Sequence, residues 1–230
     1  MQNLKILIVE PFLTGSHKAW VEGYVNSSKH EIKIISLPGR FWKWRMHGGA
    51  ITLAKRYHNL NFNPDLILVT DMLNLPVFQS LVKPECPVAI YFHENQFTYP
   101  WSPNDADVEM QRDKHYGFIN YSSALSADYV FFNSQFHLDS FFTGLEYFLR
   151  QFPDYREIQN IDKIRSGLKF KLWWRLASVT APPCMRHFQK RPGRLINSIL
   201  CLLLLTYPST QALWEPVRKG STIRIFKFYT

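Results

Sequence analysis

Short apolar runs that alternate with longer helical segments restrict the fold of this chain more than any other feature. The apolar runs lie at 4–9, 30–37, 65–70, 87–92 and 129–132. Helices are predicted over 18–26, 51–59, 75–82, 105–128 and 136–151. Strands and helices that alternate over about 150 residues favour a parallel, three-layer α/β sheet with right-handed crossovers. We therefore predict one α/β domain over residues 1–163.

Charge divides the 230-residue chain into two parts. Residues 1–163 carry 15 Lys and Arg against 17 Asp and Glu, whereas residues 164–230 carry 12 against 1, so the net charge of +9 comes from the second part. From about Gly167 onwards the α/β rhythm stops and prolines are scattered. We predict that residues 164–230 form an irregular, poorly ordered basic tail, able to adhere non-specifically to nucleic acid or membranes.

Three features predict an intracellular protein without a membrane span. Cys86, Cys184 and Cys201 lie far apart, which indicates neither a disulfide framework nor a zinc site. The first residues read as a strand and not as a signal peptide. The apolar run 195–205 is too short to cross a bilayer, which takes about 20 residues. We predict a cytoplasmic location, with the nucleus as an alternative.

Polar residues follow the fourth apolar run at the point where that strand should end. These residues are His93, Glu94, Asn95 and Gln96. Ligands of open α/β sheets bind beyond the carboxyl ends of the strands, so this position favours a functional site. The alternative is that His93 and Asn95 only satisfy the backbone of a loop.

Three other strand ends carry candidate ligand groups. A turn with Gly15 at the start of a helix, which Ser16 could cap, would present backbone N–H groups and the positive end of a helix dipole to a phosphate. A single glycine is weak support, and an ordinary turn is the alternative. The candidates at these ends are Gly15, Ser16 and His17, then Asp71, then Asn133 and Ser134.

Residues 38–49, PGRFWKWRMHGG, combine basic and aromatic side chains in a predicted loop. Such a mixture can contact a nucleic-acid backbone and stack on bases, and the alternative is that the tryptophans cover the core. The candidate RNA contacts are Arg40, Trp42, Lys43, Trp44 and Arg45. Within the helix predicted over 105–128, His115 and Tyr116 are interpreted as packing or surface residues.

Four ordered motifs resemble the tRNA-queuosine α-mannosyltransferases, also called the glycosyltransferase-like domain-containing 1 family. The motifs are MQNLKILIVEPFLTGSHKAW, RMHGGAITLAKRY, YFHENQFTYPW and FFNSQFHLDSF. The resemblance implies a retaining, family 4-like glycosyltransferase of the GT-B type, with two Rossmann-like domains facing one cleft. It also implies transfer of mannose from the nucleotide sugar GDP-mannose to queuosine in the anticodon of tRNA(Asp), with no metal, no other cofactor and no obligate protein partner.

The resemblance also implies roles for particular residues. His93, Glu94 and Asn95 would be catalytic and face the sugar or the acceptor hydroxyl. Donor or phosphate contacts would come from Gly15, Ser16, His17, Asn133 and Ser134. The basic and aromatic residues around Trp44 would contact tRNA.

Residues after 163 lack the acidic pair and Gly-rich turn of a second glycosyltransferase domain. We therefore interpret the chain as a C-terminally truncated or alternative form, which would bind donor on one side only and would not catalyse transfer alone. A non-catalytic tRNA-binding or interaction module is the second hypothesis. A methyltransferase or oxidoreductase is disfavoured, because a Gly-rich fingerprint with a strand-end acid about 20 residues later is absent.

Overall fold

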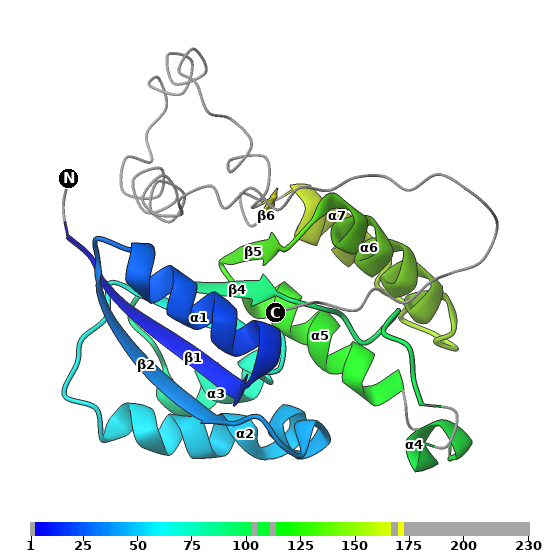
Figure 1. The fold of residues 1–230 in the computed structure, drawn as a ribbon. Coiled ribbons are helices and arrows are strands. Elements are labelled where there is room, and N and C mark those ends of the chain that lie inside the picture. The colour runs from blue at the N-terminus through cyan, green and yellow to red at the C-terminus, as the bar shows by residue number, and fades with distance from the viewer. Residues whose placement is uncertain (1–2, 103–104, 111–113, 167–169, 173–230) are drawn as a thin grey trace, which may run out of the picture.

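The computed structural model describes residues 3–102, 105–110, 114–166 and 170–172, which form a parallel sheet with helices on both faces (Figure 1). The sheet has six strands in the order β2-β1-β3-β4-β5-β6. Their bounds are β1 Lys5–Leu13, β2 Glu31–Pro38, β3 Leu66–Thr70, β4 Val88–Phe92, β5 Tyr129–Phe132 and β6 Phe170–Leu172. The predicted Rossmann-like α/β fold is confirmed, including all five predicted strands.

The helices follow the strands in the predicted alternation. Their bounds are α1 Gly15–Ser27, α2 Trp42–His58, α3 Leu75–Val82, α4 Ala106–Glu109, α5 Lys114–Ser126, α6 Gln135–Arg150 and α7 Gln159–Ser166. None of the helices in the described residues is both long and apolar enough to cross a membrane.

Alternate residues of each strand face opposite layers, so the sheet separates two hydrophobic clusters. On one face, Leu7 and Val9 of β1 pack in a cluster that also holds buried residues from α2, α3, α5, α6 and α7. On the other face, Ile6 and Ile8 lie in the cluster with Trp20 of α1. Because both faces are covered, the central strands β3, β4 and β5 are almost entirely apolar, as parallel strands usually are.

Two predicted segments differ from the structure by more than a few residues. The segment 38–49 was predicted as a loop, but α2 begins at Trp42, and its buried face continues back to Met46 with helical spacing. The single helix predicted over 105–128 is described as α4 and α5, with residues 111–113 outside the described part.

The end of the sheet also differs from expectation, because the predicted domain limit at residue 163 falls inside α7, and β6 pairs with β5 beyond it. The tail predicted after that limit otherwise lies outside the described residues.

Candidate active site at the carboxyl ends of the strands

Four strand ends bring predicted site residues together. The imidazole rings of His17, in the first turn of α1, and His93, directly after β4, have centroids 4.0 Å apart. The backbone N–H of His93 donates to Asp71 Oδ1 at 2.8 Å, and Asn133 Nδ2 donates to the carbonyl oxygen of His93 at 2.7 Å. Since β1, β3, β4 and β5 are parallel, these contacts join one edge of the sheet.

Glu10 is a buried carboxylate at this edge that the sequence interpretation missed. It lies where β1 shifts its register against β2, and it has no exposed surface. Its Oε2 is 3.1 Å from His17 Nδ1, while its Oε1 accepts the backbone N–H of Phe12 at 2.8 Å. Glutamate is rarely fully buried without a partner, so a lone acid within the apolar run LKILIVEPF was the signal that could have found it.

The two adjacent histidines, His17 and His93, have opposite shifts in pKa. Burial lowers the pKa of His17, but the hydrogen bond with Glu10 and the negative charges of Asp71, Glu10 and Glu94 outweigh burial and raise it to about 9. Burial, together with the charge of His17, lowers the pKa of His93 to about 2. Burial raises the pKa of both Asp71 and Glu94. Near neutral pH the site therefore pairs an imidazolium with a neutral imidazole.

Some buried polar atoms at this edge have no hydrogen-bond partner within the described residues. They are Thr70 Oγ1, Asp71 Oδ2 and His93 Nε2. The His93 ring is held edge-on against Trp20, at 5.1 Å between centroids, and against Tyr91, at 4.8 Å. A buried polar atom without a partner costs about 1–3 kcal/mol, so these atoms are suited to accept or donate hydrogen bonds to a polar ligand.

Asn95 is used differently from the other predicted catalytic residues. Its Oδ1 accepts the backbone N–H groups of Phe97 and Thr98 at 3.1 and 3.2 Å, and its Nδ2 donates to Ser140 Oγ at 3.3 Å. This is the loop-supporting alternative considered for Asn95 from sequence. Glu94, in contrast, receives only the side-chain amide of Gln96 at 3.3 Å among the hydrogen bonds described for it.

Phe97 anchors the segment that follows the catalytic candidates. A Cβ atom at Gly117 of α5 would lie 2.7 Å from the Phe97 ring, and one at Gly144 of α6 would lie 2.6 Å from Phe97 Cβ. Both helices need glycine here for the ring to fit between them. The segment that carries Glu94 is therefore fixed by packing as well as by hydrogen bonds.

The predicted phosphate turn is exposed at the start of α1. Gly15 has φ of 51°, a left-handed conformation that favours glycine, and Ser16 lies inside the helix instead of capping it. Thr14 occupies the N-cap position, but its side chain makes no capping hydrogen bond. The first N–H groups of α1 thus remain without a side-chain cap, as anion binding at a helix N-terminus requires.

Asn133 and Ser134 mainly support their own helix start. Ser134 caps α6, because its Oγ accepts the backbone N–H of His137 at 3.1 Å. Asn133 Oδ1 lies 3.1 Å from His137 Nδ1 and accepts the Ser134 hydroxyl at 3.0 Å. These side chains lie at the edge predicted for them. Their described hydrogen bonds are with each other, with His137 and with the carbonyl oxygen of His93.

One cluster has the donor types of a metal site. The ligand atoms of Glu10, His17 and His93 all lie within 4.8 Å of one another. Two imidazoles and a carboxylate form some zinc centres, but a ligating nitrogen must first lose its proton. Within this cluster Glu10 Oε2 and His17 Nδ1 already lie 3.1 Å apart, and the raised pKa of His17 favours an ion pair between them. The expectation that no metal is required stays a prediction.

The predicted RNA contacts fall into two sets. The inner set, Trp42 and Lys43, makes contacts within the protein, and the outer set is Arg40, Trp44 and Arg45. Trp42 packs against Trp101 and Tyr116, with centroids 5.7 and 4.9 Å away. Lys43 Nζ lies 2.5 Å from Oδ1 of Asp105, the N-cap residue of α4, and 2.6 Å from Oδ2 of Asp107 in its first turn. Trp42 and Lys43 therefore connect α2 to the region of α4 and α5, and their role as RNA contacts stays a prediction.

The outer set remains accessible. The side chain of Trp44 is 72% exposed, Arg40 is exposed, and Arg45 Nε donates to the carbonyl oxygen of Pro38 at 3.2 Å. Next to this set, the exposed rings of His47 and His115 stack with centroids 4.8 Å apart. The interpretation of His115 as a surface residue is confirmed.

Comparison with known proteins decides the family. The sequence model of the tRNA-queuosine alpha-mannosyltransferase N-terminal domain matches residues 5–169. The chain belongs to this family. It is 36% identical over 158 residues to the tRNA-queuosine alpha-mannosyltransferase of Drosophila melanogaster, which covers 66% of this chain. The chain spans 39% of the length of that relative.

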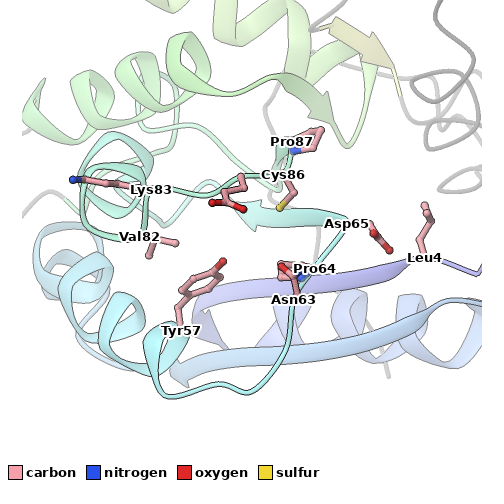
Figure 2. Close-up of a pocket in the computed structure, with 10 residues that line it drawn as sticks. Leu4, Tyr57, Asn63, Pro64, Asp65, Val82, Lys83, Cys86 and Pro87 are labelled. Carbon is pink, nitrogen blue, oxygen red and sulfur yellow. The ribbon is translucent and has the colours of Figure 1, made fainter.

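The matched region of the mannosyltransferase family contains every strand-end residue described above and the whole of α2. A separate pocket of about 590 Å³ lies at the opposite, amino-terminal edge of β3 and β4 (Figure 2). Cys86 lines it, and burial raises the pKa of this thiol to about 11, so the sulfur is not a ready nucleophile. Asp65, Lys83 and Glu85 also line this pocket.

Proposed function

We propose that this domain forms one side of the active site of a retaining GT-B mannosyltransferase, with GDP-mannose as donor and queuosine in tRNA(Asp) as acceptor. The observation that carries the proposal is the buried cluster of Glu10, His17, Asp71 and His93, which lies inside the region matched by the family. The relative's name supports a role in queuosine mannosylation.

The donor diphosphate is proposed to meet the start of α1. Two features favour an anion there: the N–H groups of the first turn have no side-chain cap, and His17 carries a positive charge near neutral pH. A positive group beside the leaving diphosphate stabilises the charge that develops as the glycosidic bond breaks.

The transferred sugar is proposed to lie against the neutral side of the cluster. His93 Nε2 and Asp71 Oδ2 are buried and lack partners within the described residues, so they suit sugar hydroxyls. Glu94 is next to them, and its raised pKa places it nearer to the range useful for proton transfer than an exposed glutamate. Asn95 would act indirectly, by holding the segment after His93.

The proposed tRNA contact uses the outer set of the α2 region. Arg40 and Arg45 would approach phosphates, and Trp44 would stack on an unpaired base. Lys43 is left out of this proposal because two carboxylates already bind its ammonium group.

The test is transfer from GDP-mannose to tRNA, with this domain in a protein of the length of the Drosophila relative. Queuosine-containing tRNA should be mannosylated, and the same tRNA without queuosine should not. His93→Ala should lower transfer at least about 100-fold, as the loss of a group that contacts the reacting atoms commonly does. His58→Ala, an exposed histidine on α2, is the matched control. Unchanged turnover of His93→Ala would remove this residue from the site.

A non-catalytic tRNA-binding role is the second candidate, and the exposed Trp44 beside Arg40 favours it. Binding of queuosine-containing tRNA to the 230-residue chain should weaken when Trp44 or Arg40 is changed to Ala, and the salt dependence should become shallower for Arg40→Ala. Binding that is unaffected by both changes would place the RNA contact elsewhere.

A further inference from the structure

The contact between Glu10 and His17 places two charged groups where the protein excludes water. Glu10 is 0% exposed and His17 is 4% exposed, with 3.1 Å between Oε2 and Nδ1. Removing ions from water is costly, and an apolar pair of similar volume is often as stable as a buried ion pair. Stability of the fold is therefore a poor explanation for this pair, which suggests a role for the charge itself.

The second oxygen of Glu10 fixes the carboxylate in place. Oε1 accepts the backbone N–H of Phe12 at 2.8 Å, so the carboxylate cannot rotate without losing a part-buried hydrogen bond. The Phe12 ring also contacts His17 edge-on, with centroids 6.0 Å apart. The orientation of the imidazole is thus set from β1 and the turn that follows it.

The charged and titratable groups around His17 come from three strand ends. Glu10 belongs to β1, Asp71 follows β3, and Glu94 and His93 follow β4. All three carboxylates act on the charge of His17, and Glu10 alone among them has a described hydrogen bond to its ring. Glu10 is therefore the group with the most direct control over this histidine.

We propose that Glu10 is a positioning residue, which holds the ring of His17 in one orientation and retains the imidazolium form at the start of α1. The charged ring and the first N–H groups of α1 then form one binding element for a diphosphate. The diphosphate part of this proposal rests on the proposed function, whereas the control of His17 by Glu10 does not.

The test is an NMR titration of the His17 imidazole between pH 5 and 10 in the 230-residue chain, with His17→Asn to assign the signal. The unchanged protein should titrate above pH 8. Glu10→Gln keeps the shape and a hydrogen-bond acceptor but removes the charge. In this variant His17 should hold its proton at least about tenfold more weakly, so the titration midpoint should fall by at least about one pH unit. Glu22→Gln, an exposed change on the same helix as His17, should leave the midpoint unchanged.

Binding of inorganic pyrophosphate and of GDP supplies a second measurement. For Glu10→Gln, affinity at pH 8 should fall, and it should recover at pH 6, where the histidine is again charged. A merely structural glutamate would not produce that recovery. If Glu10→Gln does not fold, the titration of the unchanged protein still decides, because a His17 midpoint below pH 8 overturns the proposal.

Equal His17 midpoints in Glu10→Gln and the unchanged protein would also overturn it. A third outcome is that Glu10→Gln shifts the His17 midpoint but binds pyrophosphate and GDP as well as the unchanged protein at both pH values. That outcome would support the control of His17 by Glu10 and reject a diphosphate site at this position.

Discussion

Among the described residues, two pairs of histidine rings lie in contact, one largely buried and tilted, the other exposed and stacked. His17 and His93 have ring centroids 4.0 Å apart at the carboxyl edge of the sheet, and His47 and His115 have centroids 4.8 Å apart on the surface formed by α2 and α5. In the buried pair, one pKa rises to about 9 and the other falls to about 2. In the exposed pair, burial and the charge of His115 lower the pKa of His47 and outweigh the opposing effect of Asp107.

The difference indicates that nearby carboxylates and burial, and not the contact between the two rings, determine which histidine of a pair is protonated. Glu10 binds His17 directly, whereas Asp107, the acid that acts on His47, is already paired with Lys43. Water also surrounds the exposed rings and screens their charges. The buried pair is therefore held in two different protonation states near neutral pH.

The largest expected effect is a difference in the free energy of unfolding between variants of the two histidine pairs. His17→Ala removes the partner of a fully buried carboxylate, so it should lower the free energy of unfolding by about 3 kcal/mol. His47→Ala alters an exposed side chain and should change it by less than about 0.5 kcal/mol. Urea denaturation at pH 7 measures both. Equal losses in the two variants would show that the buried ion pair has no special importance.

The pH dependence of stability gives the next largest effect. The pKa of His17 is about 9 in the folded protein against 6.5 as the ordinary value, so the folded state retains a proton that the unfolded state has released. The resulting stabilisation is complete below pH 6.5 and is lost as the pH rises to about 9. The raised pKa of Asp71 also lowers the stability of the fold as the pH rises, because ionisation of this buried carboxyl is unfavourable in the folded state.

The free energy of unfolding should therefore fall by about 2 kcal/mol between pH 6.5 and 9, a value that allows for coupling between His17 and its neighbours. Urea denaturation across this range checks the expectation, and His17→Ala should show a smaller fall. A fall of the same size in that variant would assign the pH dependence to other groups.

The sequence predicted the fold and the edge of the sheet where the cluster lies, because apolar runs mark parallel strands and their carboxyl ends must meet. It did not reveal Glu10, since a pattern of residues does not show which side chain a buried acid will reach. It also failed at α2, where tryptophan and glycine hid the spacing of Met46, Ala50 and Leu53. The pairing of Lys43 with Asp105 joins segments that are 62 residues apart, and spacing alone cannot supply that contact.

The smallest expected effect tests whether the exposed pair can be made to resemble the buried one. Lys43→Met leaves Asp107 without the ammonium group that lies 2.6 Å from its carboxylate, so more of its negative charge acts on His47. The pKa of His47 should rise, but solvent limits the change to a few tenths of a pH unit. An NMR titration of His47 measures it, with Lys55→Met, an exposed lysine on the same helix, as control.

Equal midpoints in the two variants would mean that Asp107 does not control His47. A rise of a full unit or more would mean that a nearby carboxylate suffices without burial, and the contrast between the two pairs would then rest on Lys43 alone.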